Sequence, residues 1–225
     1  MRRLLGLLLL HANEVVPADR LIDELWGPQP PETASKALQG YVSQLRKLLG
    51  QGVLLTEPSG YVLRVDADRI DVRRFESLVE AAASSEPAGA AAKLKEALAL
   101  RTGPPLTDFS YDDFARGEIT RLEELELAAR EAQIDADLRI GRHASVVGEL
   151  EALIVANPLR ERLRAQLMTA LYRSGRQADA LQAYSDARRL LVEELGLEPG
   201  EELQDRKSTR LNSSHIQKSR MPSSA

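Results

Sequence analysis

The stretch TASKALQGYVSQLRKLLG, from Thr33 to Gly50, predicts one helix with two faces of different chemistry. Its apolar residues recur at intervals of four, three and four, as on a helix that packs against a core, namely Leu38, Val42, Leu45 and Leu49. No acidic residue occurs in this stretch, although acids outnumber bases in the whole chain. The polar face could be an ordinary solvated surface, but Lys and Arg also suit phosphates, and Gln, Ser and Gly suit base edges in a major groove. The helix is therefore a candidate for DNA recognition.

The residues that follow this helix favour DNA recognition over a plain solvated face. Two short β-rich runs, 53–56 and 61–65, come directly after it. They are joined by the sequence EPSG, residues 57–60, whose Pro and Gly suit a tight turn. A helix followed at once by a hairpin predicts a winged helix.

Two further helices are expected before the recognition helix. Residues 4–10 are apolar nearly all round, which predicts a buried helix. The same run, behind two arginines, could be a signal peptide, but it is short and no small-residue cleavage site follows it. Residues 18–26 place three aliphatic side chains and a Trp on one helical face, and Gly27 with the Pro-rich segment after it ends that helix. Thr33 is then expected to be the N-cap of the recognition helix.

The rest of the chain has a helical pattern that becomes a repeat. Helices are expected over 70–83, over 90–100 and from 111 or 112 to 140, with the segment SSEPAG interrupting the pattern after residue 83. Beyond them six residues recur after 34 positions: Ile134, Ala136, Leu138, Gly141, Arg142 and Ala144 are matched by Met168, Ala170, Tyr172, Gly175, Arg176 and Ala178. Thirty-four residues is the period of tetratricopeptide repeats, which are stacked helical hairpins. The sequence thus predicts a helical-repeat domain after the winged helix.

Composition limits the chemistry that the chain can perform. It has 225 residues, 43% of them hydrophobic and only 4% aromatic, which favours helices in two small domains. It has no Cys, so disulfides and thiolate metal sites are excluded, and its three His residues stand far apart. No P-loop or dinucleotide fingerprint occurs, and the acids at 123, 124 and 126 lie on a charged helical face beside arginines. We therefore expect no enzyme, no cofactor and no metal. No segment reaches transmembrane length, so we expect a cytoplasmic protein without membrane contact.

The charge is divided unevenly along the chain, whose net charge is −4. Residues 1–66 contain seven bases and seven acids, so any DNA affinity must come from a local patch. Residues 67–204 contain 18 bases against 26 acids and form the acidic part. The tail DRKSTRLNSSHIQKSRMPSSA, residues 205–225, drops the helical period and resembles a translated sequencing adapter. We expect this tail to be non-native, the alternative being a native basic tail.

Three segments resemble a known family in their order and spacing. VVPADRLIDELWG, TASKALQGYVSQLRKLLG and TEPSGYVLRV resemble the winged helix-turn-helix of OmpR-type regulators, and within that class the Streptomyces antibiotic regulatory proteins. Later segments, which begin DADLRIGRHASV at Asp135 and ARRLLVEELG at Ala187, resemble the bacterial transcriptional activator domain of the same family. The resemblance implies a mainly α fold, with a winged helix-turn-helix over 1–66 and an α-helical tetratricopeptide-like domain over 67–204. The small sheet that precedes the first helix in the family has no counterpart in this sequence.

The resemblance also implies where DNA would bind. Aligned on VSQLRKLLG, the positions that face bases are Gln39, Gly40 and Gln44. The positions near phosphates are Lys36, Tyr41, Ser43, Arg46 and Lys47, and the wing supplies Ser59, Gly60 and Tyr61. Tyr41 has a second interpretation as a half-buried aromatic, because it flanks the apolar stripe. Glu57 stands where the family often has a base, so wing contact is expected to be weak.

The function implied by the resemblance is transcriptional activation. The implied partners are double-stranded DNA and RNA polymerase, with a homodimer formed on directly repeated sites. Two alternatives stay open at this point. The chain could be a helical-repeat scaffold whose winged helix binds protein, or the front part of a longer regulator with a downstream ATPase domain.

Overall fold

The predicted recognition helix is α3 (Ala34–Leu49) in the computed structural model, which describes residues 1–206. Three members of its predicted apolar stripe, Leu38, Val42 and Leu45, are each 2% exposed, whereas the fourth, Leu49, is half-buried. Thr33 occupies the expected N-cap position, but its side chain makes no capping hydrogen bond. The polar face opposite the stripe is consequently left at the surface.

The described residues form two compact units. The first contains Met1–Glu80 and Glu96–Leu127, and the second contains Ala81–Lys95 and the residues from Ala128 onward. Helix α6 (Asp113–Arg139) contributes residues to both. Of the tail expected to be non-native, residues 207–225 lie outside the described residues.

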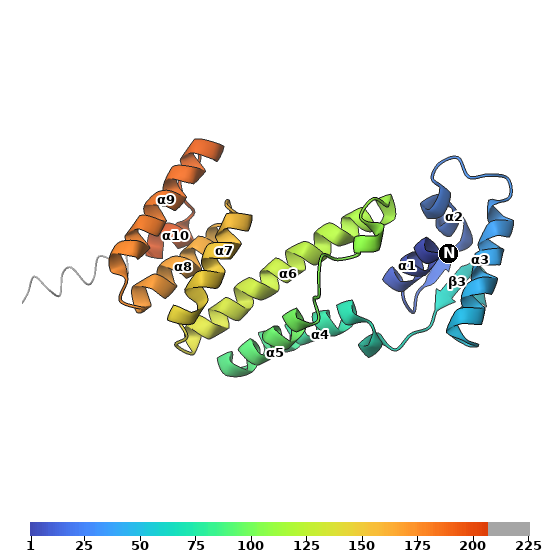
Figure 1. Cartoon of the computed structure of the whole chain (residues 1–225), viewed down its shortest axis with the longest axis horizontal. Helices are drawn as coiled ribbons and strands as arrows, with labels where there is room; N and C mark the ends of the chain where they lie inside the picture. The colour runs from blue at the N-terminus through green and yellow to red at the C-terminus, as the bar shows by residue number, and fades with distance from the viewer. Residues whose placement is uncertain (207–225) are drawn as a thin grey trace, which may run out of the picture. The chain divides into compact units, whose positions relative to one another are not determined.

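Three helices and a small sheet make the winged helix of the first unit. Helices α1 (Arg2–Leu10), α2 (Ala18–Trp26) and α3 gather around the sheet, drawn in blue in Figure 1. The predicted hairpin is confirmed as β2 (Leu54–Glu57) and β3 (Gly60–Leu63). Their shared core is almost entirely aliphatic, and its buried members include Leu4, Leu8, Leu21, Leu25, Leu38, Leu45, Leu54 and Leu63.

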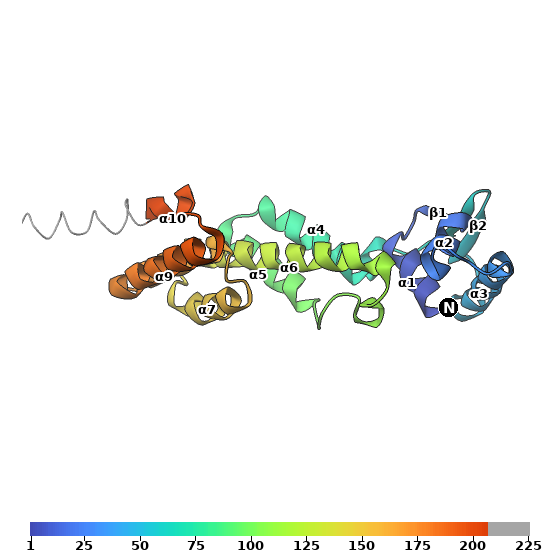
Figure 2. The same cartoon turned by 90° about the horizontal axis from the view of Figure 1, so that it is seen from above.

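A third strand, β1 (Val15–Pro17), was not expected from the sequence. It pairs antiparallel with β3, with Val15 opposite Val62, so that the sheet order is β1-β3-β2. Figure 2 labels β1 and β2 beside α2. Asn13 forms the turn that leads into β1 and ties it to the end of the hairpin. Its backbone adopts a left-handed conformation with φ of 69°, and its side-chain amide donates to the Val65 carbonyl at 2.8 Å and accepts from the Val65 N–H at 3.1 Å. The chain therefore turns from α1 directly into the sheet.

After the wing, the chain contributes Ala81–Lys95 to the second unit and then returns to α1. The turn η1 (Ala67–Arg69) leads into α4 (Asp71–Ala83), and α5 (Pro87–Ala99) is followed by η2 (Thr107–Phe109). Gly6 of α1 lies so close to the ring of Phe109 that a Cβ there would be 2.6 Å from the ring. Arg3 supports the same contact, because its Nε lies 2.9 Å from a carboxylate oxygen of Asp112. The expected start of α5 at residue 90 was wrong: the helix begins at Pro87, because proline is well accommodated at the first helical position.

The second unit contains the predicted 34-residue repeat. Besides parts of α4, α5 and α6, this unit contains α7 (Val147–Ala156), which follows η3 (Ala144–Val146), then α8 (Glu161–Arg173), α9 (Gln177–Leu195) and α10 (Glu201–Asp205). Gly141 and Gly175 both adopt positive φ, of 88° and 81°. The Arg142 N–H donates to the Asp137 carbonyl at 2.9 Å, and 34 residues later the Arg176 N–H donates to the Leu171 carbonyl at 2.9 Å. The repeat is thus confirmed at its turns, which close by the same backbone hydrogen bonds.

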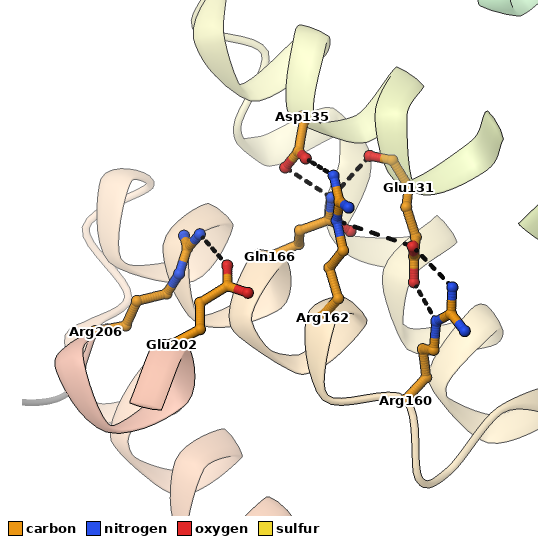
Figure 3. A network of polar contacts seen from close by, with 7 residues as sticks. All are labelled: Glu131, Asp135, Arg160, Arg162, Gln166, Glu202 and Arg206. Atoms are coloured by element: carbon orange, nitrogen blue, oxygen red, sulfur yellow. Dashed lines mark hydrogen bonds and ion pairs between the residues drawn. The ribbon is translucent and has the colours of Figure 1, made fainter. Parts of the chain in front are cut away.

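A buried carboxylate joins α6 to α8 within the second unit (Figure 3). Glu131 is 1% exposed, and its oxygens accept hydrogen bonds from Arg160 Nε at 2.7 Å and Nη2 at 3.2 Å. Gln166 Nε2 donates to the Glu131 carbonyl and to Asp135 Oδ1, each at 2.7 Å. Arg162 pairs with Asp135 at 2.6 Å, and this hydrogen bond raises the pKa of the Arg162 guanidinium. Because a buried charge is costly unless it is paired, this network is best understood as a connection between the two helices.

Candidate nucleic-acid interface

The polar face of α3 forms one exposed surface. Apart from Tyr41, every residue of this helix predicted to contact DNA is exposed: Lys36, Gln39, Gly40, Ser43, Gln44, Arg46 and Lys47. Since the opposite side of the helix is held in the core, this face can enter a groove without disturbing the fold. The structure therefore brings together the helix residues that the sequence singled out.

The charge of this surface is positive and uncompensated. Helix α3 contains no acidic residue, and within residues 1–206 neither Lys36 nor Lys47 forms an ion pair or a side-chain hydrogen bond. Arginines of the second unit differ in this respect; Arg188, for example, forms two hydrogen bonds with the carboxylate of Glu198. The two lysines are thus available to an external anion such as a phosphate.

A groove of about 720 Å³ separates the C-terminal half of α3 from the wing. It is lined by Gln39, Val42, Ser43, Arg46, Lys47, Gly50, Gln51, Thr56 and Tyr61. Sequence reasoning missed Gln51 and Thr56 as members of this surface. No local pattern marks them, because the groove exists only once the hairpin has folded beside the helix.

The wing residues occupy two different environments. Ser59 is exposed at the turn, and its carbonyl accepts a hydrogen bond from the Ala18 N–H at 3.2 Å. Gly60 is buried under β1, where a Cβ would lie 2.0 Å from the carbonyl oxygen of Val16. Gly60 is therefore required for the pairing of β1 with β3, and its contact with DNA stays a prediction. Glu57 is half-buried at the end of β2.

Tyr41 packs against the end of α2. Its ring stacks on that of Trp26, with centroids 6.1 Å apart and planes inclined by 6°. Both rings are half-buried, so the interpretation of Tyr41 as a half-buried aromatic is confirmed, whereas its contact with a phosphate stays a prediction. The stack fixes α3 with respect to α2, the partner helix of a helix-turn-helix.

Arg46 is the one base of α3 that is held by the wing. Its Nε donates to the Leu54 carbonyl at 2.9 Å, and its Nη2 donates to Thr56 Oγ1 at 2.6 Å. These two bonds direct part of the Arg46 guanidinium towards β2, and its contact with a phosphate stays a prediction.

Two family models match the chain, one over the winged helix and the other over the helices that follow it. Residues 1–63 match the family described as transcriptional regulatory protein, C terminal, and residues 70–209 match the bacterial transcriptional activator domain. The fold and the exposed face of α3 thus define a winged helix joined to a bacterial transcriptional activator domain.

Individual relatives align with most of this chain. Regulatory protein DnrI of Streptomyces peucetius is 42% identical over 218 residues, which cover 90% of this chain and 80% of DnrI. Regulatory protein AfsR of Streptomyces griseus is 44% identical over 206 residues, 90% of this chain but only 21% of AfsR. The solved structure of Mycobacterium tuberculosis EmbR in complex with a low affinity phosphopeptide has a TM-score of 0.89 at 37% identity, covering 94% of this chain and 59% of that one. The chain belongs to the family of the Streptomyces antibiotic regulatory proteins.

Two further observations bear on other kinds of function. Among residues 1–206, no helix combines the length and apolar character needed to span a bilayer. Within the same part of the chain, no group of three or more His, Cys, Asp and Glu side chains is arranged to hold a metal ion. AfsR and DnrI are both named regulatory proteins.

Proposed function

We propose that this chain is a sequence-specific transcriptional regulator that binds double-stranded DNA through α3 and the wing and activates transcription. The observation that carries the proposal is the exposed, acid-free face of α3, on which Lys36 and Lys47 have no ionic partner within the described residues. The family supports it, because relatives that share most of this chain are named regulatory proteins.

In the proposed complex, α3 enters the major groove with its exposed face. Gln39 and Gln44 reach base edges, and Gln44 pairs with adenine in the bidentate manner that its amide allows. Gly40 lies between them and lets the helix backbone approach the bases. Lys36, Ser43 and Lys47 contact phosphates on either side, and Ser59 brings the wing turn to the neighbouring backbone.

The partners of the complete regulator form a second part of the proposal. A homodimer would bind directly repeated sites, and the helices of the second unit would contact RNA polymerase. Support for these partners comes from the family alone. The chain spans only about a fifth of the length of AfsR. That short span is also compatible with this chain being the front part of a longer regulator.

Selection from random duplex DNA tests the proposal directly. The full chain is equilibrated with a library of random duplexes at two salt concentrations, and the bound fraction is sequenced. An enriched motif that weakens as salt rises is expected, because phosphate contacts release counterions. Two copies of the motif in the same orientation, spaced by about one helical turn of DNA, would support the dimer on direct repeats. Absence of any enriched sequence would refute sequence-specific binding.

A scaffold that uses the winged helix to bind protein is the competing function. Matched lysine variants separate the two. Lys36→Ala and Lys47→Ala should each weaken binding to the selected duplex, whereas Lys95→Ala removes the same charge from an exposed position on α5 and should leave binding unchanged. Equal effects of all three variants would show that DNA responds only to the overall charge of the chain.

A further inference from the structure

The side chain of Arg46 crosses from the recognition helix to the wing. It projects from the last turn of α3, and both of its hydrogen-bond acceptors, the Leu54 carbonyl and Thr56 Oγ1, belong to β2. Leu54 is itself 2% exposed, so the first acceptor lies at the edge of the core. The guanidinium thus joins the element that would read the bases to the element that would touch the backbone.

Strand β2 needs such a connection because it is an edge strand. In the sheet order β1-β3-β2 it pairs with β3 on one side only. The other edge of β2 presents the Leu54 carbonyl, which would otherwise have to be satisfied by water. Two directed hydrogen bonds from one planar group fix both the position of the strand and its rotation relative to α3.

The neighbouring Lys47 provides a contrast on the same helix turn. Both side chains are exposed and positive, but within residues 1–206 the Lys47 side chain makes no hydrogen bond or ion pair. The Lys47 side chain is therefore free to bind a phosphate, whereas two donor groups of Arg46 already bond to the wing. Arg46 would then affect DNA binding by holding the wing in position.

We infer that Arg46 is a positioning residue that locks the wing to the recognition helix, and that it acts on DNA binding through this lock and not as a phosphate contact. The inference rests on the proposed DNA-binding function. It assigns to Arg46 and Thr56 a joint role that is separable by experiment from the role of Lys47.

Charge-conserving and acceptor-removing variants of the full chain test the inference on the selected duplex. Arg46→Lys keeps the charge but loses the fork geometry, so it should weaken binding about tenfold, nearly as much as Arg46→Ala. Thr56→Val should weaken binding about threefold, and Thr56→Ser, which keeps the hydroxyl, should bind like the wild type. Because the two residues form one contact, Arg46→Ala combined with Thr56→Val should bind no more weakly than Arg46→Ala alone.

Salt dependence separates a lock from a phosphate contact. Lys47→Ala should reduce the slope of log affinity against log salt by about 0.9, the value for one lost phosphate contact, whereas Arg46→Ala should leave the slope nearly unchanged. The inference is overturned if Arg46→Lys binds like the wild type while Arg46→Ala lowers the slope as Lys47→Ala does.

Hydrogen exchange without DNA supplies a readout that does not depend on the proposed function. Amides of β2 and β3 should exchange faster in Arg46→Ala and Thr56→Val than in Lys47→Ala, while the amides of α3 keep their protection. Retained α3 protection also shows that the variants fold. Unchanged exchange in the wing of Arg46→Ala would overturn the lock itself. A wild-type chain that binds no duplex would instead remove the proposed function and the DNA role of Arg46, whatever the exchange rates.

Discussion

Substituting Gly40 by Ala should make the winged helix more stable and its complex with DNA weaker. Gly40 lies inside α3, and a Cβ added there would meet no atom within 4 Å. Glycine in a helix interior costs roughly 0.5–1 kcal/mol relative to alanine, because it loses more backbone freedom on folding. With no clash to offset this gain, Gly40→Ala should raise the melting temperature by about 2–8 °C for a unit of this size.

The same methyl group would project towards DNA in the proposed complex. Gly40 stands between Gln39 and Gln44 on the exposed face, at a position predicted to face bases. A Cβ there holds the helix away from the base edges, and an interface that loses one base contact loses about 1–3 kcal/mol. The expected loss of affinity for the selected duplex is about five- to hundredfold.

The assay needs a probe for folding of the winged helix and a matched glycine elsewhere. The one Trp of the chain, Trp26, stacks on Tyr41 of α3, so its fluorescence follows unfolding at the recognition helix. Gly117 is the control, because it is exposed, lies inside α6 and has the same open surroundings. Gly117→Ala should leave DNA affinity unchanged. A Gly40→Ala variant that melts higher and binds DNA like the wild type would refute the base-facing position of Gly40, and one that melts lower would refute the open geometry around it.

Three more substitutions test other parts of the first unit. Gln44→Ala should reduce the preference for the selected duplex over random DNA by about 1–3 kcal/mol in a competition assay, and equal loss on both duplexes would contradict its assignment to a base. Glu57→Gln should strengthen binding about twofold, because it removes a negative charge from the wing, and an unchanged affinity would place that side chain away from phosphates. Gly6→Ala should destabilise the unit by about 1–3 kcal/mol in thermal unfolding, because its methyl group would overlap the ring of Phe109. The same change should cost little in a Phe109→Ala background, and equal costs in both backgrounds would argue against the contact.

Local periodicity was sufficient to predict the elements that carry the proposed function. The spacing of Leu38, Val42 and Leu45 defined the buried side of α3, and all three are 2% exposed. The polar face followed from that stripe, because a helix has a fixed number of residues per turn. The 34-residue repeat was equally readable, since Gly141 and Gly175 adopt the same left-handed conformation that few other residues tolerate.

Features that depend on distant partners were not readable in the same way. Strand β1 has three residues, and its partner β3 begins at Gly60, far along the chain. So short a run carries no alternating pattern, and its pairing depends on the turn at Asn13 and on the missing side chain of Gly60. Pro87 misled the prediction for another reason. Proline and glycine were taken as a break in the helix, although proline at the first helical position is favourable.

In the candidate site, too, the local sequence predicted the exposed face, but the contacts of individual side chains depend on the folded hairpin. The resemblance to the family placed both Arg46 and Lys47 near phosphates, and their residue types and positions on the helix gave no reason to separate them. Only the folded hairpin distinguishes them, by placing the Leu54 carbonyl and Thr56 within reach of one side chain and not the other. The sequence of a recognition helix therefore indicates which face meets DNA, whereas the wing that folds against it determines which of the exposed charges remains free to bind.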